Sequence, residues 1–203
     1  MENSRLKNSA LNFASGFLGR VLAILLNFAV RTIFIYCLNE AYLSVNGLYS
    51  NILTVLSLAE LGFGSAMVYR MYAPVAVKDY QKAAALLQFY KKIYIIIGVV
   101  IFLLGLCVIP FMDYIIKDKP DISGLTLYYI LFLVNTSISY WFSSYKASVL
   151  YADQKEYIKT NVQNTMAILQ SGLQIVLLLL FRKYLLYLLI QLAGNIFLNL
   201  YVA

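Results

Sequence analysis

Long apolar stretches dominate the sequence and restrict its fold more than any other feature. A membrane-spanning helix needs about 20 apolar residues, and six stretches reach that length, at 11–38, 45–72, 84–111, 125–150, 160–181 and 184–203. Of the 203 residues, 62% are hydrophobic and 12% are charged, whereas soluble domains have about 25% charged residues. No strand-like alternation runs through these stretches, so we expect an all-α, polytopic membrane protein rather than a soluble enzyme.

The positions of lysine and arginine predict how the six helices are oriented. With a cytoplasmic N-terminus, ten basic residues lie on the cytoplasmic side and four on the other. The ten are Arg5, Lys7, Arg70, Lys78, Lys82, Lys91, Lys92, Lys146, Lys155 and Lys159, and the four are Lys117, Lys119, Arg182 and Lys183. Because basic residues concentrate in cytoplasmic loops, the net charge of +7 indicates membrane orientation and an anionic substrate rather than nucleic acid.

The sequence lacks the residues that most enzyme active sites use. The sequence has no histidine, and Cys37 and Cys107 do not have the spacing of metal ligands. It contains neither a GxxxxGK[ST] phosphate loop nor a pair of carboxylates suited to acid–base catalysis. The first apolar stretch is too long for a cleavable signal peptide. We therefore expect no catalytic residue, no metal site and no cofactor.

Polar side chains recur at helical spacing inside five of the apolar stretches. Residues seven and eleven positions apart lie within about 20° of one face of a helix. The candidates for a substrate cavity are Arg20, Asn27, Arg31, Glu60, Asn135, Lys146, Gln163, Gln170, Gln174, Gln191 and Asn195. Asparagine, glutamine and serine rows also join helices by hydrogen bonds, and arginines near helix ends reach toward lipid headgroups. Rows on five helices, with two arginines among them, favour a hydrated cavity over these alternatives.

Glu60 is the one carboxylate well inside an apolar stretch. It has two interpretations: a buried ion pair with Arg20 or Arg31, or a titrating group that couples transport to a cation. The adjoining Gly62-Phe63-Gly64 predicts either close helix packing or a bend in the second helix. Most of the 18 tyrosines lie near the ends of the stretches, as in an aromatic belt.

Three segments resemble the start of Wzx-type polysaccharide flippases, which belong to the superfamily of the MATE exporters. The segments are YLSVNGLYSNIL at 42–53, LSLAELGFGSA at 56–66 and VYRMYAP at 68–74. Further similarity lies at 31–36 (RTIFIY), at Tyr145-Lys146, at 152–155 (ADQK) and in the glutamine-bearing fifth stretch. The similarity is specific over residues 31–74 and is mostly hydropathy elsewhere.

The resemblance implies a two-lobed carrier of about twelve helices around a central cationic cavity. Such carriers move an undecaprenyl-diphosphate-linked oligosaccharide across the bacterial plasma membrane by alternating access, driven by a gradient of H⁺ or Na⁺. Their partners are membrane lipids, a polysaccharide polymerase and glycosyltransferases. Family members are about twice as long as this chain, and its last apolar stretch reaches Ala203 with no loop after it. We therefore expect residues 1–203 to form the N-terminal six-helix lobe.

Arg20 and Arg31 are then the candidates for binding the diphosphate, because guanidinium groups match phosphate oxygens. The neutral amides suit hydroxyl-rich sugars. Three alternatives remain open: a MATE-like exporter of cationic drugs, a non-transporting scaffold of a polysaccharide assembly complex, and a membrane-embedded glycosyltransferase. The first is disfavoured by two membrane arginines against one carboxylate. The last is disfavoured because the acidic residues that cluster, Asp113, Asp118 and Asp121, lie in one loop where solvation is the ordinary explanation.

Overall fold

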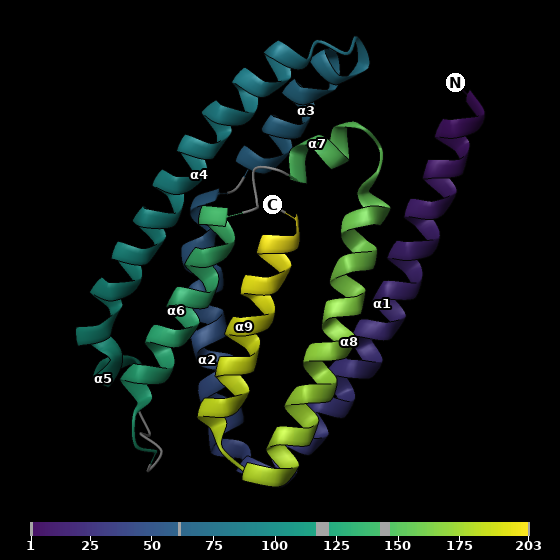
Figure 1. Ribbon diagram of the computed structural model, residues 1–203. Helices are drawn as coiled ribbons and strands as arrows, with labels where there is room; N and C mark the ends of the chain where they lie inside the picture. Colours follow the sequence, from purple (N-terminus) through teal and green to yellow (C-terminus); the bar gives the residue numbers. More distant parts are fainter. Residues whose placement is uncertain (1, 61, 117–121, 143–146, 203) are drawn as a thin grey trace.

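The computed structural model describes residues 2–60, 62–116, 122–142 and 147–202, and these ranges consist of helices joined by short turns, without a strand (Figure 1). The longer helices are α1 (Glu2–Leu38), α2 (Glu40–Ser57), α3 (Phe63–Ala76), α4 (Tyr80–Val108), α6 (Leu125–Phe142), α8 (Glu156–Phe181) and α9 (Tyr184–Val202). Shorter ones are η1 (Leu58–Glu60), η2 (Ile109–Phe111), α5 (Met112–Ile115) and α7 (Ala147–Ala152). The prediction of an all-α protein is confirmed.

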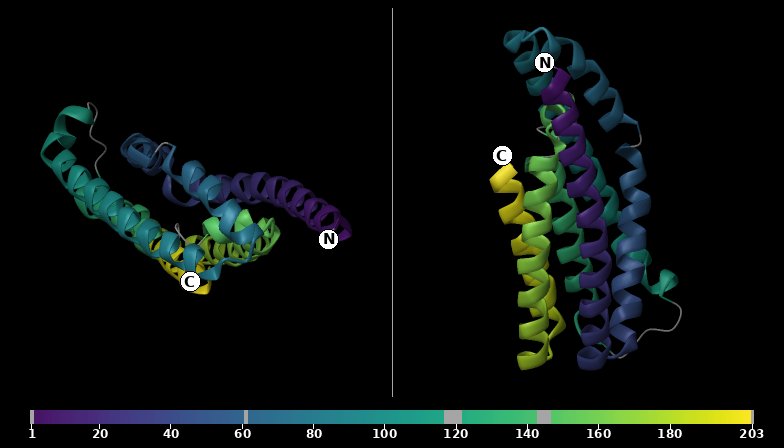
Figure 2. Two further views of the ribbon diagram at one scale, coloured as in Figure 1. Left: turned by 90° about the horizontal axis from the view of Figure 1, so that it is seen from above. Right: turned by 90° about the vertical axis from the view of Figure 1, so that its right-hand side faces the viewer.

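The long helices form a curved row in the order α1, α8, α9, α6 and α4. Helix α2 packs on one side of this row, against α1, α6 and α4, and α3 packs against α7 and α4 (Figures 1 and 2). Helices α2 and α3 run in the same direction, and, with these two taken together, successive long helices run in alternating directions (Figure 1). The α3–α4 and α7–α8 connections lie at the end of the bundle where α1 begins, and the α1–α2 and α8–α9 connections lie at the opposite end (Figure 1). This alternation is what the predicted topology requires.

Five helices in the described ranges are long and apolar enough to cross a membrane. They run over Ser9–Leu38, Tyr80–Phe111, Leu125–Phe142, Glu156–Phe181 and Tyr184–Tyr201, and each overlaps one of the predicted stretches. The chain is therefore a multi-pass membrane protein. The one predicted stretch without a counterpart among these five is the second, 45–72.

A break divides that second stretch, so the prediction of one continuous helix over 45–72 is wrong. Helix α2 ends at Ser57, a 3₁₀ turn covers Leu58–Glu60, and α3 begins after Gly62, which has φ +89°. A positive φ destabilises any residue that has a Cβ atom, whereas glycine adopts it without strain. Of the two interpretations of Gly62-Phe63-Gly64, the structure shows the bend.

Other boundaries follow local signals, with two differences. Asn39, at φ 79°, accepts a hydrogen bond from the Ala41 amide and separates α1 from α2 without a longer loop. Pro74, predicted to follow the second helix, lies inside α3, which continues to Ala76. The predicted fourth helix, 125–150, is described as α6 up to Phe142 and as α7 from Ala147, and residues 143–146 between them lie outside the described residues.

Aromatic side chains fill the interior of the bundle. Tyr49 and Tyr129 are fully buried, and their hydroxyls donate hydrogen bonds to the carbonyls of Leu125 and Gly105, each at 3.0 Å. Other tyrosines near the ends of the predicted stretches are also buried, so the aromatic-belt interpretation is wrong for them. These are Tyr90, Tyr94 and Tyr184. The centre of the bundle is therefore packed with apolar and aromatic groups.

Candidate functional site

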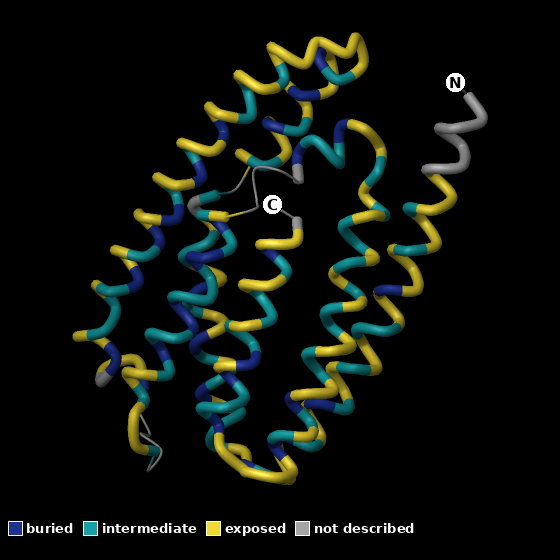
Figure 3. Tube along the Cα trace, viewed as in Figure 1, coloured by how far each residue is buried: buried dark blue, intermediate teal, exposed yellow. Residues whose placement is uncertain are grey.

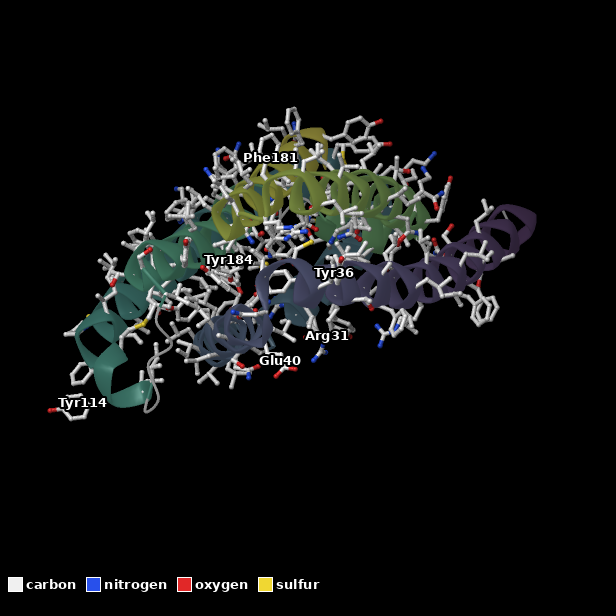
Figure 4. The ribbon with its side chains drawn as sticks, turned by 90° about the horizontal axis from the view of Figure 1, so that it is seen from below. Arg31, Tyr36, Glu40, Tyr114, Phe181 and Tyr184 are labelled. Carbon is white, nitrogen blue, oxygen red and sulfur yellow. The ribbon has the colours of Figure 1, made fainter. Side chains whose placement is uncertain are left out.

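The arginine row of α1 lies on the outside of the bundle. Helix α1 packs along α8 and buries Val30, Phe34 and Leu38, which are spaced four residues apart. Arg20, Asn27 and Arg31 are exposed, although the seven-residue spacing from Asn27 to Phe34 and from Arg31 to Leu38 puts them beside this packed strip rather than opposite it. Figure 4 shows Arg31 on the side of α1 turned away from α9, the same side on which Glu40 begins α2. The predicted row therefore exists, but it does not point into the centre.

Asn27 and Arg31 border a hollow of about 440 Å³ between α1 and α2, which we call the Arg31 hollow. From α2 it is lined by Asn46 and Gly47, and from α9 by Tyr187. Asn46 is held in place because its side-chain oxygen accepts a hydrogen bond from the Tyr184 hydroxyl, at 3.2 Å. The hollow thus combines one guanidinium with two amides.

Asn46 and Gly47 were not among the predicted site residues. The sequence signal that could have identified them is the Asn46-Gly47 pair itself, which lies within the segment 42–53 that resembles the flippases. Arg20 lies eleven residues before Arg31 on the same helix, which corresponds to about 16 Å. It shares the face of Arg31 but does not line the hollow.

Glu60 contacts neither arginine among the described side chains. Its carboxylate accepts a hydrogen bond from the Tyr94 hydroxyl at 2.7 Å, which links the break between α2 and α3 to α4. The ion-pair interpretation of Glu60 is therefore wrong. The carboxylate borders a second hollow, of about 660 Å³, between α3, α4, α7 and α8, which we call the Glu60 hollow.

The polar side chains of α6 and α9 form hydrogen bonds with each other. The Asn195 amide group donates to the carbonyl and the side-chain oxygen of Asn135, at 2.6 and 3.0 Å, and to Ser139 at 3.2 Å. One turn further along α9, Asn199 donates to Asn195. Gln191 and Asn135 line a gap between α6 and α9 that has no room for a water molecule. Asn135 and Asn195 thus join two helices, which was the alternative interpretation of such rows.

The glutamines of α8 point in different directions. Gln174 is buried and donates to the Tyr187 carbonyl of α9 at 3.4 Å. Gln170 packs against Gly194 in an otherwise apolar groove between α8 and α9. Gln163 is exposed, and Lys146 lies outside the described residues. The eleven predicted residues are therefore not gathered around one interior cavity within the described part of the chain.

No protein-family model, curated protein or solved structure matches the chain. The fold and the two hollows define it as an all-α, multi-pass membrane protein that has exposed cationic and amide groups within a membrane-length helix.

Proposed function

We propose that the chain forms part of a carrier that moves a diphosphate-linked oligosaccharide, attached to an undecaprenyl lipid, across the bacterial plasma membrane. The observation that carries this proposal is the position of Arg31. It lies seven residues before the end of α1, about 10 Å into the membrane-length helix, and it borders the Arg31 hollow with Asn27 and Asn46.

An arginine at this depth indicates an anionic ligand. A guanidinium that faces hydrocarbon without a partner is costly, so such residues face a protein or a water-filled cavity. The planar donors of arginine match the oxygens of a phosphate. The amides of Asn27 and Asn46 supply exchangeable hydrogen bonds for sugar hydroxyls at the same hollow.

We propose that the transport path runs along the open face of α1 and α2. Because the bundle centre is packed with apolar and aromatic groups, cargo would pass along the outside of this six-helix unit. The resemblance to two-lobed flippases supplies the opposite wall, a second lobe across from Arg20 and Arg31. Alternating access would then be rocking of the two lobes, driven by an H⁺ or Na⁺ gradient.

We propose a cytoplasmic N-terminus, surrounding membrane lipids, and cooperation with a polysaccharide polymerase and glycosyltransferases. The MATE-like cation exporter and the scaffold are the alternatives that an experiment must separate from it. The Arg31 hollow itself suits an anion rather than a cation, because no carboxylate is among the described residues that line it.

The experiment measures binding of undecaprenyl diphosphate to the full chain in lipid nanodiscs. Arg31→Ala should weaken binding about tenfold or more, because a charge-assisted contact to the diphosphate is lost. Arg31→Lys should be intermediate, since it keeps the charge but not the planar donors. Lys183→Ala is the matched control, because it removes an exposed cation from the α8–α9 connection at the same end of the bundle. Equal affinity of the Arg31→Ala and Lys183→Ala variants would reject the diphosphate role and favour the scaffold.

A further inference from the structure

We propose that the Glu60 hollow binds an organic ammonium ion, with the Glu60 carboxylate as its counter-ion. The hollow lies where α2 breaks, toward the end of the bundle at which α1 begins, and away from the Arg31 hollow (Figure 1). Its volume of about 660 Å³ is in the range of small-molecule pockets, which are about 300–1,000 Å³.

The Glu60 carboxylate lacks a cationic partner among the described side chains. Its neighbours are the hydroxyl of Tyr94, which donates to it at 2.7 Å, and Tyr140 of α6, which lies within electrostatic reach. Both are neutral. Lys155 is engaged elsewhere, because its ammonium lies 2.7 Å from Asp153, and this carboxylate raises the pKa of Lys155. Because buried charged groups are usually paired with an opposite charge, this half-buried carboxylate is suited to a cationic ligand.

The other walls of the hollow carry tyrosines and two more charged groups. Tyr69 and Tyr72 of α3, together with Tyr94 and Tyr151, line it. Tyrosine rings attract cations that lie over their faces. One such contact already exists within the hollow, since the Lys159 ammonium lies 5.2 Å from the Tyr151 ring centre and donates to the Tyr151 hydroxyl at 3.3 Å.

The charge balance favours a single cation. Glu156 and Lys159 also line the hollow from α8, and their opposite charges offset each other one turn apart. With Glu60 included, the described lining of the hollow has two carboxyl groups and one ammonium group. A bare metal ion fits less well, because it needs several oxygen ligands at about 2.0–2.6 Å, and the described residues contain no cluster of three potential metal ligands. The volume of the hollow, its tyrosine rings and the charges of its lining residues together indicate an alkylated ammonium ion.

The experiment measures binding of radiolabelled choline to the purified full chain in detergent, at constant ionic strength. Wild type should bind choline saturably, and Glu60→Gln should weaken binding about tenfold or more, because the counter-ion is lost. Tyr94→Phe should weaken it less, since Tyr94 is a positioning residue that holds the carboxylate. Lys159→Gln should strengthen binding several-fold, because a like charge leaves the hollow.

The matched control is Glu40→Gln, which neutralises an exposed carboxylate at the opposite end of α2. The opposite effects of Glu60→Gln and Lys159→Gln distinguish a binding site from a general loss of folding. Undiminished binding by Glu60→Gln, or no saturable binding by the wild type, would overturn the proposal. Displacement of choline by equimolar Na⁺ would reject the organic-cation class. None of these results bears on diphosphate binding at Arg31.

Discussion

At the scale of single residues, Asn195 makes more hydrogen bonds between helices than any other predicted site residue that the structure describes. It donates to both oxygens of Asn135 and to Ser139. Hydrogen bonds between membrane helices contribute about 0.6 kcal/mol on average and up to about 1.7. We therefore expect Asn195→Ala to lower the free energy of unfolding by about 1–2 kcal/mol, measured by denaturation in mixed micelles.

Ser137→Ala is the matched control for this variant. Ser137 is a fully buried polar residue of α6, and its hydroxyl has no hydrogen-bond partner among the described residues. Removing a hydroxyl without a partner leaves no other group unsatisfied. Stability should therefore stay the same or rise. If Asn195→Ala and Ser137→Ala were equally stable, the α6–α9 hydrogen bonds would contribute nothing to holding the helices together.

The polar rows of α1, α6 and α9 show how far the site could be predicted from the sequence. The spacing of Arg20, Asn27 and Arg31 correctly placed them on one face of a helix, because 3.6-residue periodicity is a local property. Which polar rows meet is decided by neighbours in space, and α6 contacts α9 although Asn135 and Asn195 are 60 residues apart. Periodicity could not distinguish a row that joins two helices from one that lines a hollow.

At the scale of elements, the break between α2 and α3 depends on Gly62. With φ at +89°, an alanine at this position would cost about 1–2 kcal/mol. We expect Gly62→Ala to lower the free energy of unfolding by that amount. Gly172→Ala is the matched control: it lies inside α8, where an added Cβ meets no atom within 4 Å, so it should stabilise the helix by up to about 1 kcal/mol. Equal effects of the two variants would mean that α2 and α3 form one helix.

Element boundaries were predictable wherever a local signal marks them. Helix α1 ends at Leu38, and the Arg182–Lys183 connection separates α8 from α9, both as predicted. A bend at Gly62-Phe63-Gly64 was one of two predicted alternatives, but the end of α2 at Ser57 was not predicted, because apolar residues continue through the break. The hydrogen bond that ties Glu60 of the break to Tyr94 of α4 joins residues 34 positions apart, which sequence periodicity does not reveal. Pro74 predicts a helix end, and α3 does end soon after it, at Ala76, but the proline lies inside the helix.

At the scale of the whole molecule, the alternating directions of the helices place basic connections mainly at one end. The α3–α4 connection lies at the end where α1 begins, and the Arg182–Lys183 connection lies at the other (Figures 1 and 3). Side chains at both connections are exposed, including Val77 and Lys183. If basic residues mark the cytoplasmic side, Val77 faces the cytoplasm and Lys183 faces outward.

Cysteine labelling in intact cells tests this orientation. In a background with Cys37→Ser and Cys107→Ser, Lys183→Cys should react with a membrane-impermeant maleimide, and Val77→Cys should react only after lysis. Labelling of Val77→Cys alone would reverse the predicted orientation, and Arg31 would then lie near the cytoplasmic surface. Labelling of both before lysis would contradict the alternating arrangement of the helices. In the predicted result the Arg31 hollow lies toward the outer surface, so the diphosphate would bind there late in transport, after cargo has passed Arg20.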